Sequence, residues 1–159
     1  MTTGLIELSD HAPQTVAVVY GHVKNSEYDD FLADAFTEVR GMLADQHLTP
    51  AGPPFARYRP TGVGLDITAG IPVDDRFRPS GRVTAELLPG GSMVTAPHVG
   101  DHGTVGFTYQ TLEEWLAGNN SQRAGDPWES FPGDGSGQTL VTVPCRPCPG
   151  NPRPYRIHP

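Results

Sequence analysis

Two segments of the chain carry apolar residues at three- and four-residue steps, the spacing of one face of a helix. The first segment runs from about Glu27 to His47, and the second from about Val105 to Gly118. The apolar stripes are Phe31, Ala35, Phe36, Val39 and Leu43 in the first segment, and Val105, Tyr109, Leu112, Trp115 and Leu116 in the second. This pattern predicts two amphipathic helices.

Short apolar or alternating runs bounded by glycine, proline and polar residues predict strands around both helices. The clearest is 65–73, where apolar residues alternate with Asp66, Thr68 and Gly70, the period of a half-buried strand. We expect strands at 15–20, 55–59, 65–73, 82–88, 92–97, 128–131 and 139–143. From Pro144 onward the chain is rich in proline, and we expect little regular structure there.

The predicted order strand, helix, strand, strand occurs twice, and residue types recur at corresponding places. Phe31, Phe36 and Val39 match Phe107, Leu112 and Trp115; Phe55 and Tyr58 match Trp128 and Phe131; Ile71 matches Val143. We therefore expect an α+β fold of tandem β-α-β-β repeats with pseudo-twofold symmetry. Both helices should cover one face of an antiparallel sheet, with a ligand cleft between the repeats.

Residues 1–146 should form the ligand-binding domain, with half-repeats at about 1–74 and 80–146. Residues 147–159 should form a proline-rich C-terminal tail.

The chain of 159 residues has a formal net charge of −7, and Lys24 is its only lysine. It lacks a basic stripe, so we expect no direct nucleic-acid binding. An acidic surface attracts cationic ligands at long range, although acidity can also serve solubility alone. No apolar run approaches the length of a membrane span, and no secretion signal is visible. The expected location is the cytoplasm, with no membrane partner.

The two cysteines, Cys145 and Cys148, form a C-x-x-C pair near the C-terminus. A second ligand pair at zinc-finger spacing is missing, and His158 lies too far along the tail to complete a set. We expect no structural metal and no cofactor.

Four segments of the chain contain short sequence motifs whose order and spacing can be compared with those of known proteins. They are 54–58 (PFARY), 64–73 (GLDITAGIPV), 88–115 with its LPGG, HVG and Tyr109–Trp115 helix, and Pro127-Trp128-Glu129. In order and spacing the chain resembles the GyrI-like family. These are effector-binding domains of multidrug-responsive transcription activators, together with stand-alone relatives that include gyrase inhibitory proteins.

Two positions depart from the family pattern. Asp101-His102 stands where the family has Pro-Tyr, and Phe131 stands where it often has tyrosine. With no helix-turn-helix ahead of the domain, the chain is expected to be a stand-alone member.

Strand alternation suggests which side chains share a face. If Trp128 and Phe55 face the helices, then Glu129, Phe131, Ala56 and Tyr58 point to the other face. Asp66 and Thr68 oppose the apolar side of their own strand and should lie there too. Two carboxylates and two aromatic rings suit a lipophilic, aromatic cation. The residue pattern alone favours an exposed Glu129 on an edge strand. The resemblance implies instead that Glu129 meets the positive charge of a bound drug.

Further candidate ligand contacts are Trp128, Met93 and His98. Met93 could line an adaptable pocket or fill the core. His98 could contact the ligand or be a hydrogen-bonded structural histidine.

Three functions remain open at this stage. The first is a non-catalytic binding module for cationic aromatic compounds. The second is a hydrolase of reactive genotoxins, an activity found among GyrI-like proteins, with Glu129 as general base and Tyr58 as proton donor. The third is a protein-interaction role such as gyrase inhibition, which an acidic surface patch would support. The longest acidic cluster, Glu27–Asp30, stands at a predicted helix start, where carboxylates are expected anyway. The sequence names no protein partner.

Overall fold

The computed structural model describes residues 5–133 and 137–149, which form two α-helices and nine strands. The chain divides into two compact units. The α1 unit comprises Ala12–Gly90 and Ser130–Pro132, and the α2 unit comprises the described residues within Met1–His11, Gly91–Glu129 and Gly133–Pro159. Each unit has its own helix, antiparallel strands and apolar core.

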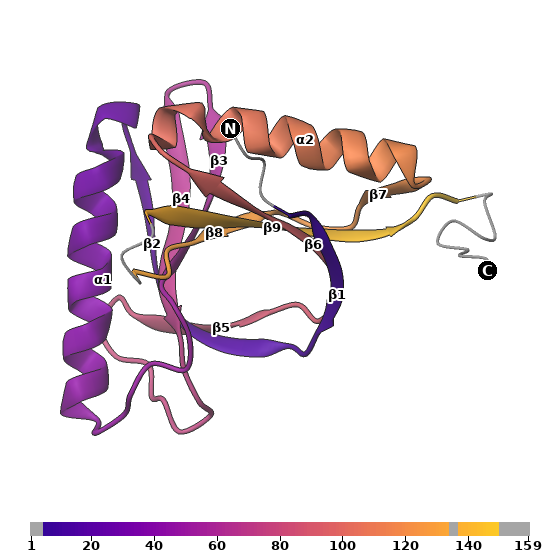
Figure 1. Cartoon of the computed structure of the whole chain (residues 1–159). Coiled ribbons are helices and arrows are strands. Elements are labelled where there is room, and N and C mark those ends of the chain that lie inside the picture. Colours follow the sequence, from indigo (N-terminus) through magenta and orange to yellow (C-terminus); the bar gives the residue numbers. More distant parts are fainter. Residues whose placement is uncertain (1–4, 134–136, 150–159) are drawn as a thin grey trace. The chain divides into compact units, whose positions relative to one another are not determined.

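In the α1 unit, helix α1 (Tyr28–Asp45) packs on one face of antiparallel strands (Figure 1). The strands are β2 (Gln14–Val23), β3 (Phe55–Thr61), β4 (Gly64–Pro72) and β5 (Thr84–Leu88), in the order β5-β2-β4-β3. A short 3-10 turn, η1 (Asn25–Glu27), leads into the helix. The buried side of α1 consists of Tyr28, Leu32, Ala35, Val39 and Leu43, which share a core with alternate residues of β2 and β4.

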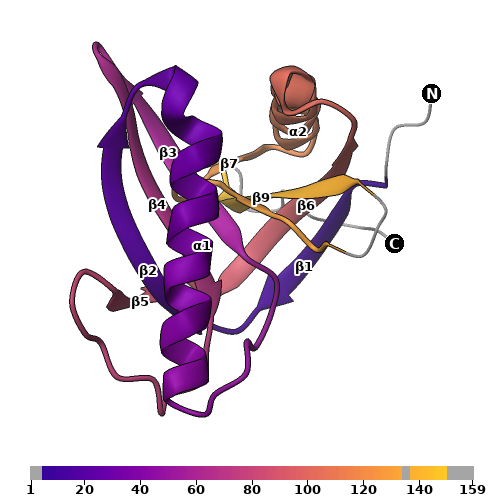
Figure 2. The same cartoon turned by 90° about the vertical axis from the view of Figure 1, so that its left-hand side faces the viewer.

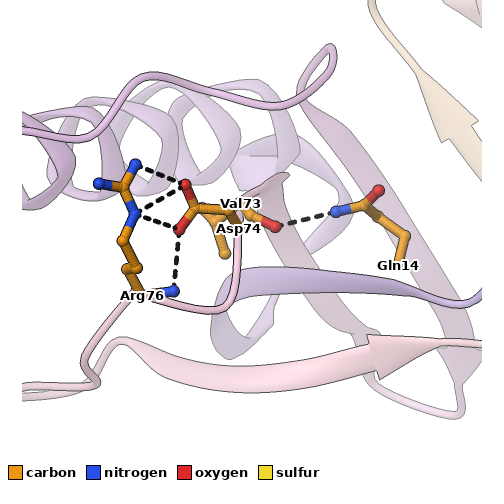
Figure 3. Close-up of polar contacts among 4 residues, drawn as sticks. All are labelled: Gln14, Val73, Asp74 and Arg76. Atoms are coloured by element: carbon orange, nitrogen blue, oxygen red, sulfur yellow. Dashed lines mark hydrogen bonds and ion pairs between the residues drawn. The ribbon is translucent and has the colours of Figure 1, made fainter.

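Polar contacts fix the loop that leaves β4 against the start of β2 (Figure 3). The Gln14 side-chain amide donates a hydrogen bond to the Val73 carbonyl at 2.9 Å. Asp74 accepts bonds from the backbone N–H and the guanidinium of Arg76, both at 2.8 Å. The two bonds from Arg76, first the one from its guanidinium and then the one from its backbone N–H, hold the pKa of Asp74 below its ordinary value.

In the α2 unit, helix α2 (Val105–Gly118) packs against β6 (Gly91–Val99), β7 (Ser121–Arg123) and β9 (Gln138–Pro147) (Figure 2). Strand β1 (Glu7–His11) pairs antiparallel with β6, which also pairs with β9. The turn η2 (His102–Thr104) precedes α2, and β8 (Trp128–Ser130) follows β7. The core contains Val94, Ala96, Val105, Leu112, Leu116, Val141, Val143 and Cys145.

The two halves of the chain repeat the same pairing and burial. Ala17 pairs with Ile71 as Val94 pairs with Val143. The helices correspond through their buried residues, Tyr28, Leu32, Ala35 and Val39 in α1 and Val105, Tyr109, Leu112 and Leu116 in α2, with Tyr109 half-buried. Both helices are followed by a residue with positive φ, His47 and Asn120. The predicted α+β class and tandem β-α-β-β order are confirmed.

The helix correspondence predicted from the sequence is wrong by one residue. Phe31 corresponds to Thr108 rather than to Phe107, because matching the buried stripes shifts the two helices by one position. Phe107 is 71% exposed, whereas Phe31 packs against the α1 core. Aromatic residues at similar places along the sequence suggested a correspondence that burial does not support.

Strand boundaries also differ from the predictions. Strand β9 continues to Pro147, so the expected loss of regular structure at Pro144 is wrong. Strands β1 and β7 were not predicted, since every residue of β1 is exposed and β7 has only three residues. Residues 150–159 of the predicted tail lie outside the described residues. Over the described part of the chain, no helix is long and apolar enough to cross a membrane.

Strands β1 and β5 do not follow the predicted half-repeats. Strand β1 pairs with β6 in the α2 unit, and β5 pairs with β2 in the α1 unit. The half-repeat boundaries at 1–74 and 80–146 therefore stay a prediction about the sequence repeat, and the compact units divide the chain differently.

We predict that Gly70→Ala lowers the free energy of unfolding by about 1–3 kcal/mol, because the added methyl overpacks the sheet. A Cβ at this position would lie 2.3 Å from the Ala17 carbonyl oxygen. Urea denaturation measures the change. The control is Gly41→Ala on α1, where nothing lies within 4 Å; it should stabilise the protein by about 0.5–1 kcal/mol. Wild-type stability of Gly70→Ala would contradict the strand pairing.

Candidate functional site

Glu129, on β8, is the most unusual side chain of the α2 unit. Its exposed fraction is 0%, and the hydroxyl of Tyr109 on α2 donates a hydrogen bond to its Oε2 at 2.8 Å. Removing a carboxylate from water is costly unless hydrogen bonds or charges compensate. The chain therefore buries an acidic group at a position where an apolar residue would avoid this cost of desolvation.

The α1 unit has apolar residues at the two corresponding positions. Matching the repeats places Leu32 at the position of Tyr109, and Ala56 at the position of Glu129. Leu32 and Ala56 are both buried in the core beneath α1. The corresponding helix and strand positions are thus apolar in the α1 unit and polar in the α2 unit. Packing alone does not require the Tyr109–Glu129 pair.

His98 forms a second polar contact of the α2 unit. Its Nδ1 lies 2.9 Å from the Thr108 hydroxyl, and its Nε2 lies 3.0 Å from the Asp101 carbonyl. Because a carbonyl only accepts, Nε2 carries a proton and donates. At the corresponding place in the α1 unit, the ring of Phe31 packs on Gly21, where a Cβ would lie 2.3 Å from the ring. These bonds fit the structural alternative for His98.

Two predicted ligand contacts, Tyr58 and Phe131, belong to the α1 unit. The ring of Tyr58 meets Tyr28 edge-on with centroids 5.6 Å apart. The ring of Phe131 lies 6.1 Å from Phe36, and its backbone N–H donates to the Pro54 carbonyl at 2.8 Å. Both side chains are half-buried at the margin of the α1 core. Each therefore keeps part of its ring accessible.

The predicted facing of these strands is wrong. Ala56 pairs with Ala69 and Tyr58 with Ile67, so Ala56 and Tyr58 lie on the sheet face that α1 covers. Glu129 likewise contacts α2 through Tyr109, although it was expected to face away from the helices. The prediction took the aromatic residues Phe55 and Trp128 as the helix-facing ones. In the structure, the helix-facing residues are instead the next residues in the chain, Ala56 and Glu129.

Asp66 and Thr68 lie on the opposite face of the α1-unit sheet from Ala56 and Tyr58. Asp66 is exposed and pairs with His22, with Nδ1 and Oδ1 2.6 Å apart. Thr68 lies between Tyr20 and Arg57 in the strand register.

A charged network occupies this same face of the sheet. Glu86 accepts hydrogen bonds from Arg57 at 2.5 Å and from the Tyr20 hydroxyl. The bond to Glu86 raises the pKa of Tyr20. The structure therefore places Asp66 and Thr68 beside a surface ion-pair network.

The remaining predicted contacts, Met93 and Trp128, are buried. Met93 has no exposed surface and alternates along β6 with Val94, which belongs to the core under α2. Met93 therefore points to the face of β6 away from α2. Trp128 is also buried, next to Glu129 on β8.

In the described parts of the chain, no three His, Cys, Asp or Glu side chains are grouped as a metal ion requires. Cys145 is a buried residue of β9, and Cys148 follows the end of that strand. Three residues of extended chain separate Cα atoms by about 10 Å, beyond the reach of a disulfide. Cys145 thus contributes to the core beneath α2.

Sequence reasoning missed the role of Tyr109 as the partner of Glu129. Tyr109 was expected to be a core residue because it falls on the apolar stripe of α2. A signal did exist in the repeat: with the helices matched by burial, a tyrosine replaces Leu32 where a glutamate replaces Ala56. The one-residue error in the helix correspondence concealed it.

No protein-family model and no curated protein sequence matches this chain. Solved structures do match it. The C-terminal domain of EcmrR has a TM-score of 0.77 at 18% sequence identity, over 92% of this chain and 99% of that one. EcmrR in its DNA complex has a TM-score of 0.75 at 19% identity, over 90% of this chain. The match covers 57% of that EcmrR chain, so the present chain spans little more than half its length.

Two further solved structures share the fold. A hydrolase from Listeria innocua has a TM-score of 0.68 at 11% identity, covering 89% of this chain and 91% of that one. SAV2435, solved bound to tetraphenylphosphonium, has a TM-score of 0.61 at 14% identity, covering 89% and 94%. At these identities the likeness shows a shared fold. That fold is consistent with the GyrI-like fold implied by the sequence motifs.

Proposed function

We propose that the protein binds small lipophilic cations and that Glu129 supplies the counter-charge. One observation carries the proposal: a fully buried carboxylate, bonded to Tyr109, stands where the matched half of the chain is apolar. A buried acidic group that packing does not require is expected to serve a ligand. The neighbour SAV2435 was solved with tetraphenylphosphonium, an aromatic cation, on the same fold.

The physical basis is charge complementarity in a site of low polarity. Away from water, the attraction between a carboxylate and a cation is screened less than at the surface. The Tyr109 hydroxyl occupies Oε2 and fixes the orientation of the carboxylate. An aromatic ring nearby adds about 0.5–2 kcal/mol of cation–π attraction. Shape then matters less than charge and apolar surface, which favours a broad range of ligands.

Other expectations from the sequence stay predictions. They are the ligand cleft between the repeats, the ligand contacts other than Glu129, the stand-alone character of the chain, its cytoplasmic location and its lack of direct nucleic-acid binding. EcmrR was solved in a complex with DNA, but this chain matches only part of EcmrR. Gyrase inhibition also stays a prediction. The acidic residues Asp29 and Asp30 lie in the first turn of α1, where carboxylates stabilise the helix, so their presence alone does not indicate a protein partner.

Hydrolysis is the second candidate, because the hydrogen-bonded Tyr109–Glu129 pair is suited to moving a proton. A hydrolase from Listeria innocua shares the fold. Glu129 would accept a proton from water as the water oxygen adds to a strained electrophilic carbon, and a tyrosine would protonate the opened ring. Mass spectrometry after incubation separates the candidates, since a hydrolysed ligand gains the mass of one water and a bound ligand does not.

We predict that Glu129→Gln weakens binding of tetraphenylphosphonium by about 1–3 kcal/mol, the size of a charge-assisted contact. A neutral aromatic compound of similar size should lose much less affinity, because apolar contacts remain. Isothermal titration calorimetry measures both. The matched control is Glu114→Gln, which removes an exposed carboxylate from α2 and should leave both affinities unchanged.

Two outcomes of that experiment would contradict the proposal. Unchanged affinity of Glu129→Gln for the cation would make the glutamate structural. Equal losses for the cation and the neutral compound would show that the substitution had damaged the site without testing its charge.

We predict that Tyr109→Phe lowers the free energy of unfolding by about 1–2 kcal/mol, because a buried carboxylate loses a donor. In a Glu129→Leu background the same change should cost less, since the carboxylate that accepts this hydrogen bond is absent. Urea denaturation of the four proteins gives the coupling energy. Additive effects would show that the hydrogen bond does not stabilise the protein.

We predict that Tyr58→Leu and Phe131→Leu each weaken cation binding by about 0.5–2 kcal/mol if these rings contact the ligand. Both variants keep apolar bulk at the margin of the α1 core. Fluorescence titration with a cationic dye measures the effect, and Phe107→Leu, at an exposed position of α2, is the control. Wild-type affinity in both variants would exclude these rings from the site.

A further inference from the structure

The α1 unit contains an open hollow of about 490 Å³ at the loop between α1 and β3. Among the described residues, four prolines contribute to its walls, Pro50, Pro53, Pro54 and Pro132, and Arg40 of α1 is the one charged residue that lines it. This volume lies within the range of small-molecule sites. The proposed cation site does not involve this hollow, although its wall residues Pro54 and Ile71 belong to the motif segments 54–58 and 64–73.

The walls of the hollow are held rigidly. The Ala51 N–H donates to the Pro72 carbonyl at 2.8 Å, which ties the loop to the end of β4. Gly52 packs so tightly that a Cβ would lie 3.2 Å from the Pro72 ring. The Phe131 N–H, next to Pro132 in the chain, bonds to the Pro54 carbonyl. Proline side chains lose little rotamer entropy when a ligand covers them, so the surface is preformed.

Arg40 is available to a ligand. Its guanidinium lies 5.9 Å from the centroid of the Phe36 ring, which orients it by a cation–π contact. Among the described residues it makes no hydrogen bond or ion pair, unlike Arg57, Arg76 and Arg82 of the same unit. Proline has no N–H, so the four wall prolines offer no backbone donors. Arg40 is thus the one charged residue among the described residues that line the hollow, and the proline rings and Ile71 supply the apolar part of its walls.

We propose that this hollow is a second small-molecule site, independent of Glu129, that takes an aromatic monocarboxylate. The ligand's carboxylate pairs with the planar Arg40 guanidinium through two parallel hydrogen bonds, a geometry that suits this pair of groups. Its flat apolar ring covers the proline rings. The two sites of the protein would then select opposite charges.

The test uses 2-naphthoate in a ¹H–¹⁵N NMR titration of the full chain. We expect saturable shifts of the Ala51, Gly52 and Phe131 amides, with a dissociation constant of about 0.1–1 mM for a ligand of this size. Arg40→Gln should weaken binding about five- to tenfold, and Arg40→Lys should fall between Arg40→Gln and wild type. Arg78→Gln, at another exposed arginine of the α1 unit, is the matched control and should bind like wild type.

Ligand comparisons complete the test. The cation 2-naphthylmethylammonium and the neutral 2-naphthalenemethanol should bind at least about fivefold more weakly than 2-naphthoate. Absence of saturable shifts at these amides would overturn the proposal. It would also be overturned if Arg78→Gln weakened binding as much as Arg40→Gln, or if the cation bound as well as the anion, because the Arg40 guanidinium would then not be the recognition element.

Discussion

A carboxylate with no exposed surface constrains everything around it. Glu129 stays compatible with the fold because the Tyr109 hydroxyl, from the helix above the strand, donates to it at 2.8 Å. A buried acceptor left without donors would cost about 1–3 kcal/mol or more. This hydrogen bond forms only if three features are right together: the position of α2 on its strands, the side of α2 that carries Tyr109, and the register of β8. A change in any one of them removes the Tyr109 hydrogen bond from the carboxylate.

The internal repeat shows which apolar packing this buried carboxylate replaces. In the α1 unit the matched positions hold the apolar residues Leu32 and Ala56, both in the core under α1. The α2 unit gives up that arrangement twice, at Tyr109–Glu129 and at His98–Thr108. Functional sites commonly retain groups that reduce stability. One half of the chain thus has the apolar packing, and the other has the buried polar groups on which our proposed function rests.

Much of the fold follows from periodicity alone. Apolar steps of three and four residues located both helices, and the alternation at 65–73 located β4, because burial on one face leaves that pattern. Strand β1 has no buried residue and hence no pattern to read. The facing of Ala56 and Tyr58 depends on pairing with β4, which no local pattern specifies. Glu129 was found through its family-like motif, but its partner Tyr109 looks like any residue of an apolar stripe.

The central claim is that the Tyr109–Glu129 pair is kept for a cationic ligand at no benefit to packing. The most direct measurement is of the double variant Tyr109→Phe with Glu129→Leu, which replaces both polar groups by apolar ones of similar size. Urea denaturation and calorimetry with tetraphenylphosphonium are run on the same samples. We predict an unfolding free energy within about 1 kcal/mol of wild type, or higher, together with loss of cation binding. A loss of stability above about 3 kcal/mol, or retained cation binding in a folded variant, would contradict the account.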